Sequence, residues 1–166
     1  MKSWPVLLGI ALCLGGCASY QLGSTLPKDI QSVYIPVFTN ETDEPGVESE
    51  TTLAAIREFQ NDGALRVTTE DSADLILTVT VREFQLKPLR YKREQATTAE
   101  EYRLTLVADI VATRTSDGSV LAERTHLEGD AEFTLASDMR AAKRDALPVA
   151  AKDLAHKIVE AVVESW

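Results

Sequence analysis

Apolar and polar residues alternate along several stretches of the chain, and this period of two predicts β-strands. Strands are expected at residues 32–38, 65–69, 75–84, 102–113 and 120–133. The regular face of the third stretch consists of Leu75, Leu77, Val79 and Val81. An Asp-Gly pair just before the last stretch is typical of a tight hairpin turn. We therefore expect three or four antiparallel strands after the first helix.

Two other stretches repeat apolar residues every three or four positions, which predicts amphipathic helices. The first covers about residues 47–61, with Leu53, Ile56 and Phe59 on its apolar face. The second follows an expected N-cap at Ser137 and continues to about residue 164. Its apolar stripe is Leu147, Ala151, Leu154, Ile158 and Val162. Pro148 removes an intrahelical hydrogen bond, so we expect it to kink or divide this helix.

This order of elements predicts the α+β class. One sheet face is apolar and both helices are amphipathic, so the economical arrangement is a two-layer sandwich. Two helices pack on one face of a mostly antiparallel, four- to five-stranded sheet. Pro36 cannot donate to a strand ladder, which places the first strand at a sheet edge there. The outer sheet face carries Thr, Arg and Glu and is expected to meet water or a polar partner.

The N-terminus has the pattern of a lipoprotein signal peptide. Lys2 precedes a mostly apolar run at 6–14, which is shorter than the roughly 20 residues that span a bilayer. Two glycines then lead directly to Cys17, whose thiol would take up diacylglycerol. We interpret residues 1–16 as a signal peptide and Cys17 as the lipidation site. An ordinary signal peptide with an incidental cysteine is the alternative.

The rest of the chain divides into a connector and one domain. Residues 17–31 form the lipidated N-terminus and connector, and residues 32–166 form a single domain. The second mature position is Ala18, not the Asp with which many Gram-negative lipoproteins are retained at the inner membrane. We therefore expect a lipid-anchored domain at the periplasmic face of the outer membrane.

Charge and cysteine content narrow the possible partners. The chain has a net charge of −9, and removal of Lys2 with the signal makes it one unit more negative. Bulk nucleic-acid binding is disfavoured, because it requires an excess of cations. Cys13 would be removed with the signal and Cys17 acylated, so no disulfide is expected within the mature chain.

Catalytic and metal-binding patterns do not stand out. His126 and His156 are far apart, and neither has another His or Cys at metal-ligand spacing. The sequence has no Gly-rich phosphate loop, Ser nucleophile elbow or Cys–His pair. We expect a non-enzymatic protein without a metal site, whose only attached group is the covalent lipid on Cys17.

One local cluster of cations interrupts this acidic chain. It consists of Lys87, Arg90, Lys92 and Arg93, with Leu89 and Tyr91 between them, in an expected hairpin tip at residues 87–99. One interpretation is an ordinary solvated tip. The other is an anion site for phosphorylated lipid head groups, because Arg and Lys supply several donors at once.

Several short segments, taken in their order along the chain, match segments of a known family. They are Ala18-Ser19-Tyr20-Gln21-Leu22-Gly23, Leu26-Pro27, residues 30–42 (IQSVYIPVFTNET), Pro45-Gly46-Val47-Glu48 and Ala99-Glu100-Glu101-Tyr102-Arg103-Leu104. With the Ala-rich stripe of the last helix, they resemble the LptE family of lipopolysaccharide-assembly lipoproteins across essentially the whole mature chain. That family's fold, two helices on a four-stranded sheet, agrees with the pattern above.

The resemblance implies a structural role at the outer membrane. LptE-like proteins plug the large LptD β-barrel, assist its assembly and help present lipopolysaccharide for insertion in the outer leaflet. Their lipopolysaccharide contacts include basic residues near a strand-hairpin tip. By resemblance, Lys92 and Arg93 lie in the lipopolysaccharide-binding region here, with Lys87 and Arg90 nearby.

Two other classes of protein stay open. Residues 33–42 partly match the Val-x-x-x-Phe-x-Asn-x-Thr pattern of regulatory or assembly lipoproteins such as LpoB and CsgG. Those proteins activate an enzyme or form a pore instead of plugging a barrel. A small periplasmic hydrolase is the third class, for which the sequence presents no site.

Overall fold

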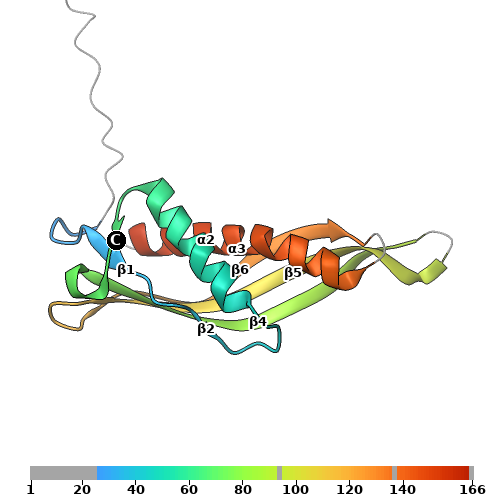
Figure 1. Cartoon of the computed structure of the whole chain (residues 1–166), viewed down its shortest axis with the longest axis horizontal. Coiled ribbons are helices and arrows are strands. Elements are labelled where there is room, and N and C mark those ends of the chain that lie inside the picture. Colours follow the sequence, from blue (N-terminus) through green and yellow to red (C-terminus); the bar gives the residue numbers. More distant parts are fainter. Residues whose placement is uncertain (1–25, 93–94, 136–137, 165–166) are drawn as a thin grey trace, which may run out of the picture.

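The computed structural model describes residues 26–92, 95–135 and 138–164. These residues form a six-stranded sheet with two α-helices on one of its faces, as Figure 1 shows. The elements are β1 (Ser32–Tyr34), β2 (Thr39–Asn40), α2 (Val47–Asp62), β3 (Arg66–Val67), the 3-10 turn η1 (Glu70–Ser72), β4 (Leu75–Lys92), β5 (Gln95–Arg114), β6 (Val120–Thr134) and α3 (Met139–Val163). The α+β class is confirmed, but the sheet has more strands than the four to five expected.

The sheet is mixed, because short parallel strands join one side of three long antiparallel ones. Its order is β3-β1-β4-β5-β6, and β2 also pairs with β4. All pairings of β1, β2 and β3 are parallel. The expectation of one strand over residues 32–38 is wrong. The chain leaves the sheet between β1 and β2, where Pro36 has no N–H to donate, and Val37 is 71% exposed.

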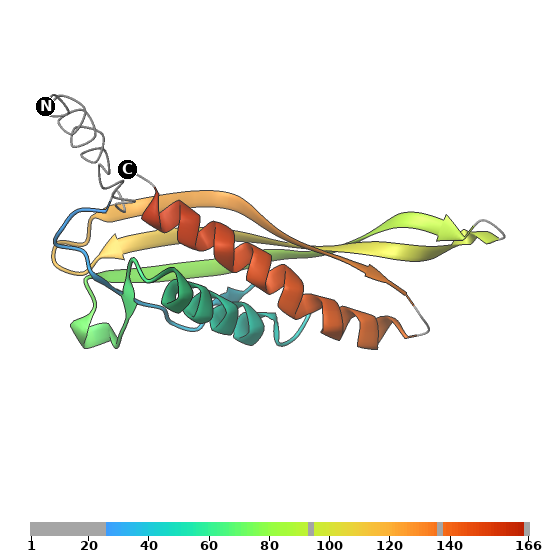
Figure 2. The ribbon, with the colours of Figure 1, turned by 90° about the horizontal axis from the view of Figure 1, so that it is seen from above.

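The β4–β5 hairpin is longer than the sequence pattern predicts. Residues 87–99, expected as a hairpin tip, instead belong largely to β4 and β5, which continue to Lys92 and restart at Gln95. At about 3.3 Å per residue, a strand of 18 residues spans ~60 Å. Figure 2 shows this hairpin projecting past the helices, away from the end where α3 finishes. The tip therefore stands clear of the core.

A β-bulge in β4 keeps its apolar residues on the helix side. Residues Leu75, Leu77, Val79 and Val81 are buried as expected. The ladder register then shifts between Val81 and Glu83, opposite Val107. This extra residue changes which face odd-numbered positions occupy. As a result, Phe84 and Leu86 continue the helix-facing row and pack against the core.

Helix α2 covers the sheet with most of the residues expected, including Phe59 and Ile56, but not with Leu53. Val47, Ala55 and Phe59 are fully buried, whereas Leu53 is 47% exposed, so its placement on the apolar face is wrong. Thr52 is buried instead, because its hydroxyl accepts a hydrogen bond from the Phe38 N–H at 2.9 Å. The expected glycine cap is confirmed: Gly63 has φ 77° and its N–H donates to the Phe59 carbonyl.

Helix α3 runs through Pro148 without being divided, which contradicts one of the two outcomes expected for this proline. Four residues of its expected stripe, Ala151, Leu154, Ile158 and Val162, are fully buried. Ser137 lies outside the described residues, and the N-cap is Asp138, whose carboxylate accepts from the Arg140 N–H. Tight packing against the sheet holds α3 in place despite the lost hydrogen bond.

Helix α3 packs directly against a glycine in β6. A Cβ atom at Gly129 would lie 2.4 Å from the Leu154 Cβ and 2.5 Å from the Ala150 carbonyl oxygen. The backbone of α3 thus touches the strand directly at this point. Of the described helices, none is both long and apolar enough to cross a membrane.

Candidate functional site

The expected anion site lies at the far end of the projecting hairpin. Lys87 pairs with Arg103 in the ladder, on the face opposite the helices. Arg90 is largely exposed, and its Nε lies 3.5 Å from a Glu101 carboxylate oxygen. Lys92 ends β4, with its backbone opposite Gln95. Arg93 lies outside the described residues, as does Cys17.

Exposed apolar side chains accompany these cations. Leu89 is 42% exposed and Tyr91 is 50% exposed. Cations beside an apolar surface suit a molecule with an anionic head and an apolar body. The structure thus places Lys87, Arg90 and Lys92 along the distal part of one strand, although Glu101 already engages one of them.

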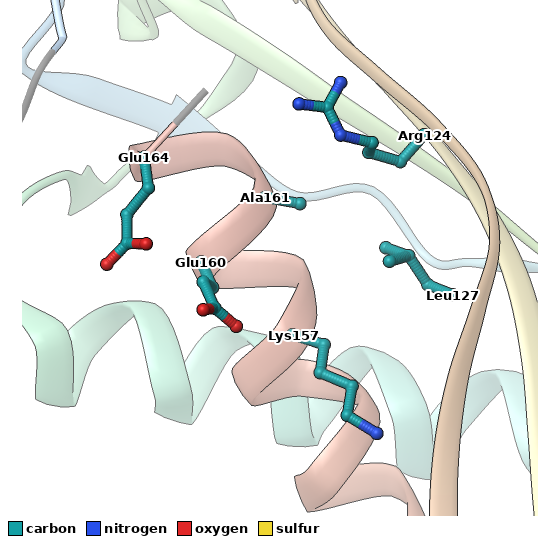
Figure 3. Close-up of a pocket in the computed structure, with 6 residues that line it drawn as sticks. All are labelled: Arg124, Leu127, Lys157, Glu160, Ala161 and Glu164. Carbon is teal, nitrogen blue, oxygen red and sulfur yellow. The ribbon is translucent and has the colours of Figure 1, made fainter. Parts of the chain in front are cut away.

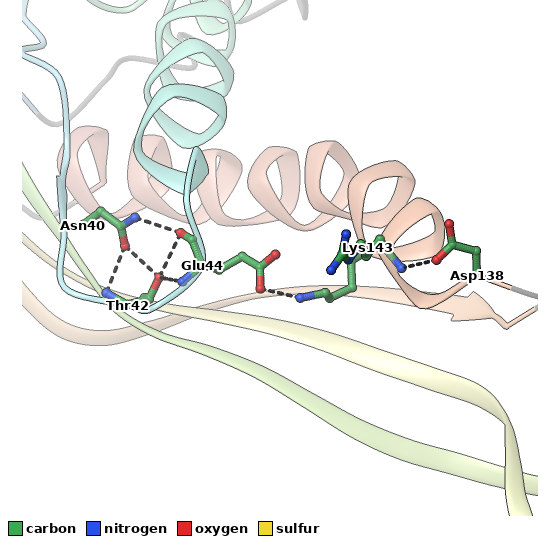
Figure 4. Close-up of polar contacts among 6 residues, drawn as sticks. Asn40, Thr42, Glu44, Asp138 and Lys143 are labelled. Atoms are coloured by element: carbon green, nitrogen blue, oxygen red, sulfur yellow. Dashed lines mark hydrogen bonds and ion pairs between the residues drawn. The ribbon is translucent and has the colours of Figure 1, made fainter.

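A loop organised by Asn40 connects β2 to α2. The Asn40 side-chain oxygen accepts from the Thr42 N–H at 2.9 Å and from the Thr42 hydroxyl at 2.7 Å. Its amide donates to the Glu44 carbonyl at 3.0 Å and to a Glu48 carboxylate oxygen at 2.8 Å. Figure 4 shows the contacts among Asn40, Thr42 and Glu44, which fold the loop back on itself. The Asn-x-Thr pattern therefore has a structural explanation, which is to fix the entry into α2.

The same loop is joined to the start of α3. The Glu44 carboxylate forms an ion pair with the Lys143 ammonium, also drawn in Figure 4. Lys143 Nζ lies 5.3 Å from the centroid of the Phe84 ring, in cation–π geometry. The ion pair connects two residues that are 99 positions apart in the sequence.

A groove of about 400 Å³ opens beside this ion pair, and we call it the basic groove. It is lined by Glu44, Pro45, Phe84, Arg140, Lys143, Arg144 and Leu147. Three cations and one carboxylate therefore face the same space as three apolar side chains. The apolar pattern of the sequence does not reveal this site, although the spacing of residues 140, 143, 144 and 147 on one helix face is a usable signal.

A second groove, of about 420 Å³, lies between β6 and the end of α3. Figure 3 shows its lining residues, Arg124, Leu127, Lys157, Glu160, Ala161 and Glu164. Two cations are balanced by two carboxylates. The groove therefore selects neither an anion nor a cation by charge.

Polar side chains of α3 protect the edge of β6 next to that groove. The Asp130 N–H donates to Asp153 at 2.9 Å, and the Lys157 ammonium donates to the Glu128 carbonyl at 2.6 Å. Burial acts to raise the pKa of Asp153, but the hydrogen bonds that its carboxylate accepts from the Asp130 N–H and, at 2.9 Å, from the Lys157 ammonium hold that pKa below its usual value. Satisfied edge groups cannot pair with another strand.

The sheet face away from the helices is crossed by polar contacts between strands. Arg82 pairs with Glu41 and with Asp109, and Arg103 lies 2.6 Å from Glu132. The His126 N–H and then Arg82 lower the pKa of Asp109. This face is therefore polar, as the alternation pattern indicates.

The two histidines have ordinary surface surroundings. His126 Nε2 lies 3.1 Å from Glu128, and His156 Nδ1 lies 3.1 Å from Glu58. Within the part of the chain that the structure describes, no three His, Cys, Asp or Glu side chains are grouped to hold a metal ion.

Solved structures with the same fold come from several bacteria. Protein XCC0632 from Xanthomonas campestris is 16% identical, with TM-score 0.54 and coverage of 81% of this chain and 86% of that one. The hypothetical protein CT253 from Chlamydia trachomatis is 9% identical, with TM-score 0.51 and coverage of 80% and 98%. A minor lipoprotein from Acinetobacter baumannii is 13% identical, with TM-score 0.50 and coverage of 78% and 90%. At these identities they support the fold alone.

The family comparison is more specific than the structural one. No curated protein matches the chain. The family model described as LptE, lipopolysaccharide-assembly, matches residues 30–162, which include every strand and nearly all of α3. The chain therefore belongs to the LptE family.

Proposed function

We propose that this protein is a lipoprotein of the outer membrane that plugs an LptD-type β-barrel and assists its assembly. In that position it helps lipopolysaccharide reach the outer leaflet. Its role is non-enzymatic, and the lipid on Cys17 anchors it at the periplasmic face. Family membership over residues 30–162 is the observation that carries this proposal.

The polar sheet face supports the plug role. A barrel lumen is polar, so a domain that enters it needs a face that is stable in contact with water and charged side chains. The ion pairs Arg82–Asp109 and Arg103–Glu132 lie on that face of the sheet. Such a face can dock in a lumen without a large apolar patch.

Co-purification tests the partner. The full lipidated protein, extracted from membranes in mild detergent, is expected to bring down a large outer-membrane β-barrel. A C17A variant tests the anchor, because it should leave the membrane fraction. Recovery of a peptidoglycan synthase without any barrel would contradict the plug role and favour the LpoB-like alternative.

Lipopolysaccharide contact is proposed at the hairpin tip. We expect simultaneous replacement of Lys87, Arg90, Lys92 and Arg93 by Ser to weaken lipopolysaccharide binding without changing the circular dichroism spectrum. The matched control replaces Lys28, Arg57, Arg66 and Lys152, which are exposed cations elsewhere on the domain, by Ser. Equal binding by the tip variant and the native protein would show that the tip is an ordinary solvated loop.

A further inference from the structure

The second groove, between β6 and the last turns of α3, has a partly apolar lining. Leu127 from β6 and Ala161 from α3 are both half-buried, and Figure 3 shows them on opposite sides of the space between strand and helix. Ala161 is the smallest side chain of the lining, and a volume of about 420 Å³ stays open beside it. That volume lies in the range of ligand pockets. Because apolar surface in contact with water is unfavourable, the groove suits an occupant with an apolar side chain.

The charged rim of this groove favours an occupant without a net charge. Arg124 and Lys157 are balanced by Glu160 and Glu164, so neither sign of charge is in excess. Within the described residues, the carboxylates of Glu160 and Glu164 form no ion pair and no hydrogen bond. Ionised carboxylates accept hydrogen bonds from hydroxyl and amide groups. The rim therefore suits a segment that carries such donors but no charged side chain.

The edge of β6 beside this groove is closed to a further strand. The Glu128 carbonyl already accepts from the Lys157 ammonium, and the Asp130 N–H already donates to Asp153. His126, with φ 59°, also departs from the regular strand conformation in the middle of β6. An edge of this kind does not pair with another backbone. An occupant of the groove is therefore held through its side chains.

The chain itself contains a segment with this composition. Residues 18–25 (ASYQLGST), which lie outside the described residues, carry no charge in an otherwise acidic protein. Tyr20 and Leu22 supply apolar surface, and the other side chains supply hydroxyl and amide donors. The described chain begins at Leu26, at the same end of the domain where α3 finishes, as Figure 2 shows. An extended chain covers about 3.5 Å per residue, so Tyr20 can reach about 20 Å from Leu26.

We propose that residues 18–25 of the same chain dock in the second groove. The Tyr20 ring lies between Leu127 and Ala161, and its hydroxyl donates to the Glu164 carboxylate. The consequence of this docking rests on the proposed lipid anchor. A docked connector holds the groove end of the domain next to the membrane, with the hairpin tip directed away. A free connector would instead let the domain move up to about 28 Å from its anchor, in any orientation.

Photocrosslinking tests this docking in the full lipidated protein. The photoreactive residue p-benzoylphenylalanine replaces Leu22, which leaves Tyr20 native. The purified protein in dodecyl maltoside is irradiated, and cross-linked peptides are mapped by mass spectrometry. We expect cross-links to the peptides that contain Leu127 and Ala161. In a Y20S variant the yield should fall about tenfold or more, because the segment loses its main apolar contact.

A second variant changes the groove instead of the segment. In A161W the indole fills the space that Tyr20 would occupy, and the yield should again fall about tenfold. V149W is the matched control, because it adds the same side chain to α3 at a position that is 58% exposed and does not line the groove. Its yield should equal that of the native protein. S19A is the control for Y20S, and thermal melting checks that A161W is folded.

Several results would overturn the proposal. They are an undiminished yield in Y20S or in folded A161W, cross-links scattered over the domain, cross-links between two copies of the chain, and cross-links to detergent or lipid alone. The measurement uses purified protein without the barrel. Membrane fractionation and co-purification of the barrel do not depend on Tyr20. Failure of the cross-link would therefore leave the proposed function standing, and failure of the co-purification would not remove the cross-link.

Discussion

Replacement of Gly129 by Ala tests how α3 is seated on the sheet. Glycine to alanine ordinarily stabilises a protein by about 0.4–1 kcal/mol where the backbone permits it, because the unfolded chain loses freedom. Gly129 has an ordinary φ, so that gain should apply here. The new Cβ, however, would lie 2.4 Å from the Leu154 Cβ and 2.6 Å from the Leu154 nitrogen. Because of this clash, we expect G129A to lower the stability of the protein instead of raising it.

The magnitude follows from these distances. Carbon atoms pack at about 3.5–4.0 Å, so α3 must move away from β6 by about 1 Å. The atoms in the way belong to the helix backbone and to the buried Leu154, which cannot rotate aside. Overpacking of this kind costs about 1–3 kcal/mol. A net loss of ~2 kcal/mol would lower Tm by about 4–8 °C in a domain of this size.

Thermal unfolding followed by circular dichroism measures this loss. The matched control is G63A, where a Cβ meets no atom within 4 Å and only the positive φ of 77° opposes the substitution. Amide exchange of Asp130 gives a local reading, since its N–H donates to Asp153 on α3 and should exchange faster in G129A. A Tm for G129A equal to or above the native value would refute the close contact of α3 with β6.

Two further predictions concern the polar contacts. N40A removes the side chain that joins Thr42, Glu44 and Glu48, and we expect urea unfolding to report a loss of about 1–3 kcal/mol. The exposed N61A is its control, and an equal effect of both would contradict the role of Asn40. The Ser32 hydroxyl and the Gln31 N–H lower the pKa of Asp74, so its ionised form stabilises the fold above the unfolded pKa of about 3.9. This contribution is lost as pH falls through the folded pKa of Asp74. The difference in unfolding free energy between the native protein and D74N should therefore shrink below about pH 4. A difference that stays constant down to about pH 2 would contradict this role of Asp74.

Much of the secondary structure is determined by local sequence pattern. The row from Leu75 to Val81 and the stripe from Ala151 to Val162 are buried as the periodicity predicts. Gly118 has φ 72° in the Asp-Gly turn, where the Asp117 carboxylate accepts from the Ser119 N–H at 2.9 Å. These features depend on neighbours a few residues apart, so the sequence alone is enough to place them.

The features that the sequence pattern predicts wrongly depend on contacts between residues that are distant in sequence. Leu53 fits a helical stripe, yet it is exposed because α2 turns Thr52 toward the Phe38 N–H instead. Residues 87–99 look like a polar tip, but the ladder between β4 and β5 supplies hydrogen bonds that extend both strands. In each case a backbone partner elsewhere in the chain outweighed the local apolar pattern.

By itself, the sequence determined the class of fold, the two amphipathic helices, the long antiparallel strands and the cluster of cations near residue 90. Only the tertiary structure decided that Gly129 receives the backbone of α3 and that Glu44 meets Lys143 beside Phe84. The basic groove exists because three distant segments pack together, the loop before α2, strand β4 and the first turns of α3. Periodicity reports which face of an element is apolar, but it carries no information on which elements that face will meet.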